Sequence, residues 1–294
     1  MSAVLGIDVG GTKVALRLEP DGQPPREAGF AWPGSSTADD DLARLHGHAR
    51  TLIGDHVVRA VGVAMPATLD GAGRVTAWPT RPAWTGLDLR AALDRRFGPA
   101  LVRVADDGDL AAIAEAAAAG CADVVYLGVG TGIGGGAVVG GRPCPGPGRG
   151  SCEVGHILVD RAGPRCDCGR AGCLQAIASG ASTLRRAAAA RGAPVTFDEL
   201  REAWPAGAAW AVSTVQESAA ALAAAAVSLG ELFRPSLTLI GGGFAAGLPG
   251  FVPAVAERSA ALGRPGHPPA PVRAATLGAV SSLHGALLLA RAAD

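Results

Sequence analysis

Three acidic residues precede an alanine-rich stretch in "RVADDGDLAAIAEAAAAG", residues 103–120. Asp106 and Asp107 are adjacent, and Asp109 follows after one glycine. Helix capping explains one of these carboxylates, because aspartate accepts hydrogen bonds from the free N–H groups of a first helical turn. Two or three carboxylates exceed what one cap needs. The cluster is therefore either a helix cap alone or a cap beside a carboxylate that takes up a proton during catalysis.

A second group of reactive side chains lies in "HILVDRAGPRCDCGRAGC". It contains His156, Cys166, Cys168 and Cys173, one imidazole and three thiols within eighteen residues. This spacing predicts a tetrahedral zinc site, and the alternative is three unrelated buried cysteines. Four protein ligands leave no position for water, so the zinc is expected to be structural. Its expected role is to hold the adjacent "EVGH" segment rigid, with the second ring nitrogen of His156 directed outward.

Three glycine-rich turns each follow an apolar segment, and glycine lets backbone N–H groups approach phosphate oxygens. Each turn taken alone is more often just a hairpin turn, and the first lacks the spacing of a P-loop. Three such turns in one chain favour a nucleotide site, with Asp8 placed to hold Mg²⁺ through water. The candidate phosphate-binding residues are Gly10, Gly11, Thr12 and Lys13; Gly130, Thr131 and Gly132; and Gly241, Gly242 and Gly243.

The elements that must position these residues repeat coarsely along the chain. A strand, a glycine turn and a second strand are expected over 3–22 and again over 123–143. Residues 58–70 are expected to be a strand that runs into a proline-containing loop, and another strand is expected to end at the acidic cluster. The stretch 140–165 is expected to be a loop, and helices are expected near 110, over 178–191 and over 218–233. This predicts a small α/β lobe of residues 1–112, completed by a C-terminal helix over 275–294, and a large lobe of residues 113–274.

Composition excludes several functional classes. The chain has 294 residues, of which 49% are hydrophobic and 18% charged, and its 26 basic residues balance its 26 acidic ones. No charge run is typical of a nucleic-acid or membrane tether. Asp8 interrupts the segment where a signal peptide needs its apolar centre, and the alanine-rich runs are too short for a membrane span. The sequence therefore predicts a cytoplasmic protein that binds neither nucleic acid nor membrane.

Taken together, these motifs resemble those of the ROK family of sugar kinases, which includes glucokinases, over nearly the full chain. The matching segments are "DVGGTK", the acidic cluster, "LGVGTGIGGG", "EVGH", "CDCGRAGC" and "IGGG". The resemblance implies an α/β, two-lobed, actin-like or hexokinase-type (ribonuclease H-like) fold with a zinc-binding loop. It further implies transfer of the γ-phosphate of ATP, with Mg²⁺, to a sugar hydroxyl, and a homodimer.

Carried over by position, the resemblance matches Asp107 to the catalytic base and Glu153 and His156 to sugar contacts. It also matches His156 and the three clustered cysteines to the zinc site. The chemistry agrees, because phosphoryl transfer needs a positioned hydroxyl, a carboxylate for its proton, and cations or N–H groups on the phosphates. This favours catalysis over capping for Asp107 and leaves the start of the helix to Asp109 or Gly108.

Two positions and one loop depart from the pattern of glucose-specific relatives. Asp106 stands where they usually carry the Asn that contacts the sugar's 3- and 4-hydroxyls, and Gln175 stands where they usually carry a Glu near the anomeric end. The loop "TAWPTRPAWTG", residues 76–86, is richer in aromatic residues and proline. We interpret these changes as altered substrate choice with catalysis intact. Asp106 and Gln175 are therefore both candidate substrate-binding residues.

The charge at position 106 suggests a substrate. An ionised aspartate only accepts hydrogen bonds, and a buried charge is costly unless it is paired. A hexose with an ammonium group on carbon 3 would satisfy both Asp106 and Glu153. The favoured acceptor is 3-amino-3-deoxyglucose (kanosamine), phosphorylated at its 6-hydroxyl. The alternatives are a C7-cyclitol of the valienone or valiolone type, and glucose itself with Asp106 protonated.

A regulator is the alternative outside catalysis. Sugar-responsive repressors of the same family carry a DNA-binding helix-turn-helix before the kinase-like part. Here the first glycine turn begins near residue 8 and the net charge is zero, so the sequence disfavours this function.

Overall fold

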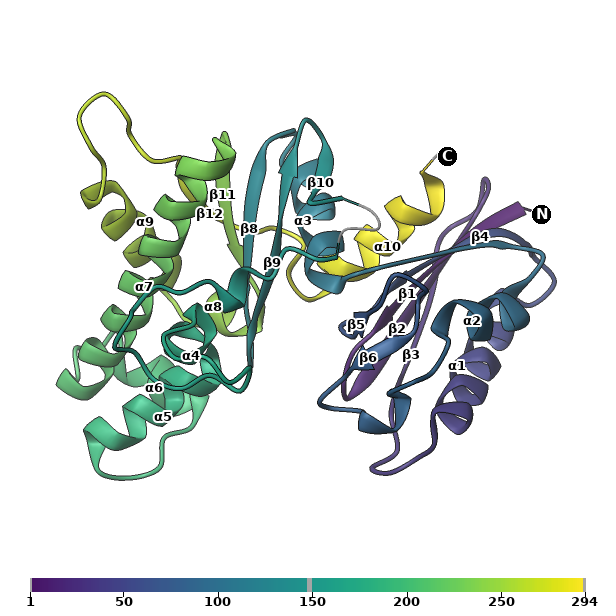
Figure 1. Cartoon of the computed structure of the whole chain (residues 1–294), viewed down its shortest axis with the longest axis horizontal. Helices are drawn as coiled ribbons and strands as arrows, with labels where there is room; N and C mark the ends of the chain where they lie inside the picture. The colour runs from purple at the N-terminus through teal and green to yellow at the C-terminus, as the bar shows by residue number, and fades with distance from the viewer. Residues whose placement is uncertain (1, 147–149, 293–294) are drawn as a thin grey trace. The chain divides into compact units, whose positions relative to one another are not determined.

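The structure is a computed structural model that describes residues 2–146 and 150–292. The chain divides into two compact units. Figure 1 colours the chain from purple at the N-terminus to yellow at the C-terminus. Unit 1 contains residues 1–114, 145–151 and 280–294, and unit 2 contains residues 115–144 and 152–279. Each unit is an α/β structure built on one five-stranded sheet.

The sheet of unit 1 has the strand order β3-β2-β1-β4-β7. Strands β1, β4 and β7 are parallel, whereas β1, β2 and β3 follow one another as antiparallel neighbours, so the predicted N-terminal hairpin is confirmed. The elements are β1 (Ser2–Val9), β2 (Lys13–Pro20), β3 (Arg26–Ala31), α1 (Ala38–Ile53), β4 (Val57–Ala64), β5 (Thr68–Leu69), β6 (Val75–Ala77), the short helix η1 (Pro82–Trp84), α2 (Leu89–Phe97), β7 (Leu101–Ala105) and α10 (Ser281–Arg291).

Alternation along β1 divides the core of unit 1 between the two faces of its sheet. Leu5 and Ile7 face a cluster that includes the leucines of α1 and α2, whereas Val4 packs with Leu287 of α10. A Cβ added to Gly62 of β4 would lie 1.8 Å from the carbonyl oxygen of Ala286, so only glycine allows α10 to lie this close. The C-terminal helix therefore completes unit 1 by packing on β1 and β4.

The sheet of unit 2 has the order β10-β9-β8-β11-β12, with β8, β11 and β12 parallel. Its core gathers alanines and leucines of the long helix α7 against the sheet. The elements are β8 (Val124–Val129), β9 (Ile133–Val139), β10 (Arg142–Cys144), the short helix η2 (Val154–His156), α4 (Leu174–Ala178), α5 (Gly180–Arg191), α6 (Phe197–Ala203), α7 (Ala209–Phe233), β11 (Leu237–Gly241), α8 (Gly243–Gly247), α9 (Phe251–Ala261), β12 (Val272–Ala274) and the short helix η3 (Gly278–Val280).

Helix α3 (Asp107–Ala118) crosses the division at 114/115. The buried carboxylate of Glu115 in its last turn accepts hydrogen bonds from the backbone N–H groups of Thr276, at 2.8 Å, and Leu277, at 3.0 Å. The predicted loop at 140–165 contains β10 and η2, and its residues 147–149 lie outside the described residues. The last two residues of the predicted C-terminal helix segment, 293 and 294, also lie outside them.

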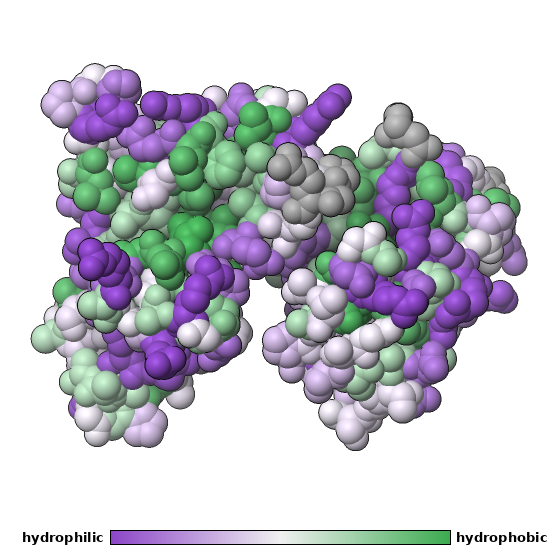
Figure 2. All heavy atoms as spheres, in the orientation of Figure 1, coloured by the Kyte–Doolittle hydropathy of each residue, from purple (hydrophilic) through white to green (hydrophobic). Residues whose placement is uncertain are grey.

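Helix α7 is longer than the sequence pattern predicts, because it begins at Ala209 and not near 218. By length and composition it is the one described helix able to cross a membrane, but half of its most apolar window is buried inside unit 2. Figure 2 shows hydrophobic residues gathered on the visible face of unit 2 between α7 and β8, with hydrophilic residues spread over the rest of that face. The burial of α7 is that of a core helix.

Candidate functional site

The acidic residues of unit 1 lie at the carboxyl edge of its parallel strands. Asp8 of β1 is in register with Ala64 of β4, and Ala64 is in register with Ala105 of β7. Asp106 and Asp107 follow β7 directly, so they leave the sheet at the level of Asp8. This edge of a parallel sheet is where α/β proteins bind their ligands, because side chains from successive strand ends converge there.

Asp106 caps helix α3. Its Oδ1 accepts hydrogen bonds from the backbone N–H groups of Gly108, at 3.0 Å, and Asp109, at 3.2 Å. The expectation that Asp109 or Gly108 serves the helix start is therefore wrong, because those two residues donate to the cap. Both of these capping bonds go to the same oxygen of Asp106. Asp107 is the first residue of the helix and is partly exposed, whereas Asp109 is buried.

The carboxyl group of Asp8 has an elevated pKa. Burial at the end of β1, reinforced by the negative charge of Asp107 and opposed by Lys13, raises the pKa of Asp8 to about 6. Asp8 and Asp107 are therefore close enough to interact electrostatically. A cation beside Asp8 would relieve this repulsion, which is consistent with the predicted magnesium position.

This pKa predicts how stability depends on pH in the nucleotide-free protein. A folded-state pKa above the ordinary value stabilises the protein at low pH, and this contribution is lost as pH rises from about 4 through about 6. Asp8→Asn is expected to raise the free energy of unfolding at pH 7.5 by about 2 kcal/mol, with no gain at pH 4. Urea unfolding at both pH values measures this, with the exposed Asp39→Asn as control. An equal effect of Asp8→Asn at both pH values contradicts the account.

The first glycine turn joins β1 to β2. The N–H of Gly10 donates to the carbonyl of Lys13 at 2.9 Å, which closes the turn. Among residues 2–146 and 150–292, no protein atom accepts a hydrogen bond from the N–H of Gly11 or of Thr12. These two donors are suited to phosphate oxygens.

The other two glycine turns lie together in unit 2. The β8–β9 turn is formed by Gly130, Thr131 and Gly132, and the carbonyl of Gly130 accepts a hydrogen bond from Gly180 at the start of α5. Gly242 follows β11 with φ of +83°, and a Cβ there would lie 2.5 Å from the carbonyl oxygen of Val129. The turn at Gly242, which joins Gly241 at the end of β11 to Gly243 at the start of α8, therefore packs against the end of β8.

The structure brings the four predicted metal ligands of unit 2 together. One ligand atom from each of the four lies within 4.8 Å of all the others. His156 Nδ1 is 3.7 Å from Cys166 Sγ, and Cys168 Sγ is 3.6 Å from Cys173 Sγ. A tetrahedral zinc with bonds of about 2.3 Å to sulfur places its ligands about 3.8 Å apart, so the cluster fits that metal. The backbone N–H of Arg170 is the main cause that lowers the pKa of Cys168 to about 6, which favours the thiolate that metals bind.

Gln175 contacts this cluster. Its Nε2 donates to Cys166 Sγ at 3.5 Å, and a Cβ added to Gly132 would lie 3.3 Å from its Oε1. Gln175 therefore lies between the metal cluster and the second glycine turn. Glu153 directly precedes η2, which packs on β9.

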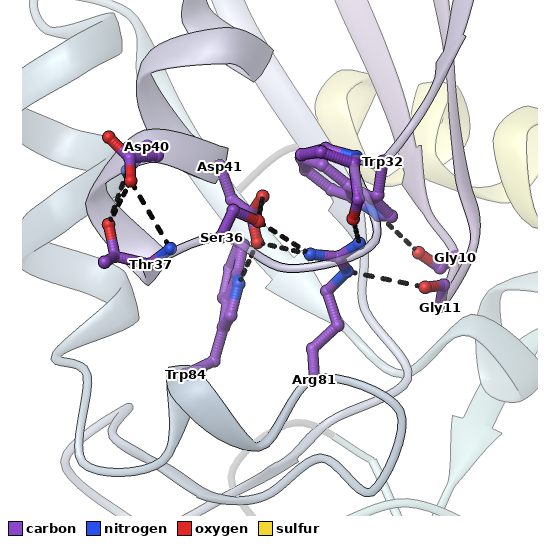
Figure 3. Close-up of polar contacts among 10 residues, drawn as sticks. Gly10, Gly11, Trp32, Ser36, Thr37, Asp40, Asp41, Arg81 and Trp84 are labelled. Carbon is purple, nitrogen blue, oxygen red and sulfur yellow. Dashed lines mark hydrogen bonds and ion pairs between the residues drawn. The ribbon is translucent and has the colours of Figure 1, made fainter.

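Sequence reasoning missed a buried network in unit 1, drawn in Figure 3. The carboxylate of Asp41 is fully buried and pairs with Arg81 at 2.8 Å. Asp41 looks like one of several exposed acids at the start of α1, so its type and spacing carry no signal of this burial. Trp78 and Trp84 of the predicted substrate loop are also buried, so their indole rings pack in the core of unit 1.

With this geometry established, comparison with known proteins gives the class: the chain belongs to the ROK family, whose model matches residues 4–293. It is 54% identical over 289 residues to a kanosamine kinase of Amycolatopsis mediterranei (strain S699), covering 97% of this chain and 95% of that protein.

Solved structures agree on the fold. A ROK hexokinase from Thermus thermophilus is 33% identical with a TM-score of 0.87, covering 98% of this chain and 97% of that one. A ROK glucokinase from Streptomyces griseus, solved with glucose and AMPPNP, is 28% identical with a TM-score of 0.82, covering 98% and 99%. The predicted two-lobed α/β fold of ROK hexokinases is therefore confirmed.

Proposed function

We propose that this protein is an ATP-dependent sugar kinase that phosphorylates the primary 6-hydroxyl of an amino sugar, with 3-amino-3-deoxyglucose (kanosamine) as the favoured acceptor. The observation that carries the proposal is the pair Asp106 and Asp107 at the carboxyl edge of the parallel strands of unit 1. The 54% identity to a kanosamine kinase over nearly the whole chain supports it.

In the proposed reaction, Asp107 accepts the proton of the acceptor hydroxyl as that oxygen attacks the γ-phosphorus of ATP. The bond from the γ-phosphorus to its bridging oxygen breaks, and ADP leaves. The free N–H groups of Gly11 and Thr12 hold phosphate oxygens. Thr131, the N–H groups of its glycine turn and the turn before α8 are the further nucleotide contacts proposed in unit 2.

Two metals are part of the proposal. Mg²⁺ accompanies ATP, neutralises phosphate charge and is held by Asp8 through water. Zn²⁺ is held by the cluster of His156 and three cysteines, whose spacing fits it. Because Nδ1 of His156 faces Cys166, Nε2 is the nitrogen left to contact the sugar. A cytoplasmic homodimer is proposed from the family resemblance alone.

The preference for an amino sugar rests on what Asp106 can accept. With Oδ1 occupied by the cap of α3, Oδ2 is the oxygen proposed to bind the carbon-3 substituent. An ammonium group donates to a carboxylate in a charge-assisted bond, which is about twice as strong as a bond from a neutral hydroxyl. Glu153 is the second proposed contact near carbon 3.

The substitution Asp106→Asn tests this preference cleanly. Asparagine keeps an oxygen for the cap of α3 and replaces Oδ2 with an NH₂ group, which repels an ammonium. We expect kcat/KM for kanosamine to fall by about 10- to 100-fold, because one charged hydrogen bond is lost. The value for glucose is expected to change by less than about threefold. Steady-state assays with both sugars and MgATP measure the ratio of kcat/KM for kanosamine to kcat/KM for glucose.

The second candidate function is that of an ordinary glucokinase, favoured by the likeness to the Streptomyces griseus enzyme. In that case the wild type prefers glucose and Asp106→Asn leaves the ratio unchanged. A panel that adds C7-cyclitols distinguishes the remaining alternative. The control is Asp88→Asn, which makes the same change of side chain at the N-cap of α2, also in unit 1. It is expected to leave the ratio of kcat/KM for kanosamine to that for glucose unaltered.

A further inference from the structure

The first glycine turn is held from behind by side chains that the proposed reaction does not use. Trp32 Nε1 donates to the carbonyl of Gly10 at 2.8 Å, and Arg81 Nε donates to the carbonyl of Gly11 in a long bond of 3.4 Å. The backbone N–H of Trp32 donates to the carbonyl of Thr12 at 3.0 Å. Three consecutive carbonyls of the turn therefore have donors, and Figure 3 draws the bonds to the carbonyls of Gly10 and Gly11.

Peptide geometry converts these contacts into an orientation. In a trans peptide, the carbonyl and the N–H point in opposite directions from one rigid plane. Fixing the carbonyls of Gly10 and Gly11 therefore directs the N–H groups of Gly11 and Thr12 away from Trp32 and Arg81. These are the two donors that have no acceptor among the described residues. The network behind the turn thus determines where a phosphate oxygen finds its donors.

Arg81 is the centre of that network. Its guanidinium donates to Asp41 at 2.8 Å, to Ser36 Oγ at 3.1 Å and to the carbonyl of Pro33 at 3.0 Å. It also lies 4.8 Å from the centre of the Trp32 ring, the ring that holds Gly10. The planar guanidinium of Arg81 thereby contacts both the carbonyl of Gly11 and the Trp32 ring that holds Gly10. A flexible ammonium cannot make both contacts.

Asp41 fixes the guanidinium. Besides Arg81, its carboxylate accepts hydrogen bonds from Trp84 Nε1 at 2.8 Å and from Ser36 Oγ at 2.5 Å. The Arg81 side chain is 10% exposed and that of Asp41 is fully buried. Thr80 adds a steric contact, because a Cβ on Gly11 would lie 2.6 Å from Thr80 Oγ1. The loop that carries Thr80 and Arg81 therefore packs directly on the phosphate turn.

We propose that Arg81, locked by Asp41, is a positioning residue that orients the N–H groups of Gly11 and Thr12 for the phosphates of ATP. This inference rests on the proposed function, since it concerns the nucleotide of that reaction. It goes beyond that function by assigning the loop 78–84 a role in nucleotide binding, although the sequence points to acceptor choice.

The test separates positioning from stability. Arg81→Leu alone leaves the buried charge of Asp41 unpaired, so it is expected to lower Tm. The double variant Arg81→Leu/Asp41→Asn removes both charges and is expected to regain most of that Tm. We expect the double variant to keep a KM for MgATP raised by about tenfold, because the turn is no longer held. Its KM for the acceptor is expected to stay within about twofold of wild type, because no acceptor contact is changed.

Arg81→Lys provides a second readout, because lysine retains the charge for Asp41 and loses the planar fork. We expect a Tm near that of wild type with a raised KM for MgATP. Arg90→Leu, which removes an exposed pair with Asp94, is the control and should change neither value. Recovery of the KM for MgATP together with Tm in the double variant overturns the inference. Absence of phosphoryl transfer in the wild type instead overturns the proposed function.

Discussion

Replacing Asp107 with asparagine is expected to lower kcat by about 1,000-fold while leaving the protein folded. Asparagine has nearly the shape of aspartate and cannot take up the acceptor's proton, and a positioned general base contributes about 10²- to 10⁴-fold to a rate. Helix α3 keeps its cap because that cap is Asp106. Single-turnover and steady-state assays with MgATP measure the loss, and thermal unfolding confirms the fold.

Asp109→Asn is the matched control, since Asp109 lies in the same first turn of α3. Its side chain is buried, so we expect its replacement to lower Tm and to change kcat by less than about fivefold. Acceptor binding by Asp107→Asn, measured by calorimetry, should remain near that of wild type. Full activity in Asp107→Asn, or a larger loss of kcat in Asp109→Asn, contradicts the assignment of the base.

Disruption of the cluster of His156 and three cysteines is expected to have the second large effect. The four ligands connect three parts of the chain, η2, the 165–172 turn and the start of α4, and Cys173 is fully buried. A structural zinc contributes its binding energy to folding, so Cys173→Ser is expected to lower Tm by about 10 °C or more. Activity should fall with it, because His156 and Glu153 lose their fixed positions.

Zinc content gives a readout that is independent of activity. We expect about one zinc per chain in the wild type and almost none in Cys173→Ser, measured by elemental analysis after dialysis against a chelator. Cys121→Ser is the control, because that thiol lies outside the cluster and contacts the carbonyl of Asp123. A wild-type protein that is fully stable and active without bound metal contradicts the structural role.

Local pattern predicted the features that depend on residues close together in sequence. The hairpin around "DVGGTK" follows from alternating apolar residues and glycines, and the convergence of His156 with three cysteines follows from their spacing. The position of Asp106 and Asp107 at a strand end was also expected, because an apolar segment directly precedes them, whereas the register that aligns this end with Asp8 is not local. The ROK fold itself was recognised from the combination of motifs.

Features that depend on tertiary packing could not be predicted from the sequence. Asp41 and its two preceding aspartates are identical in type, and only packing against Arg81 and Trp84 makes one of them buried. Likewise, the sequence could not say which acid caps α3, because Asp106 and Asp109 both fit a first turn. The contact between Gln175 and Cys166 also required the folded loop, since the two residues are nine positions apart along the chain.

The most direct test of the account is a competition assay, in which equal amounts of kanosamine and glucose are incubated with MgATP and the purified protein. Mass spectrometry and ³¹P NMR of the products then identify the acceptor and the phosphorylated oxygen. The account predicts that kanosamine 6-phosphate forms faster than glucose 6-phosphate. Formation of glucose 6-phosphate alone, or of no sugar phosphate, would contradict it.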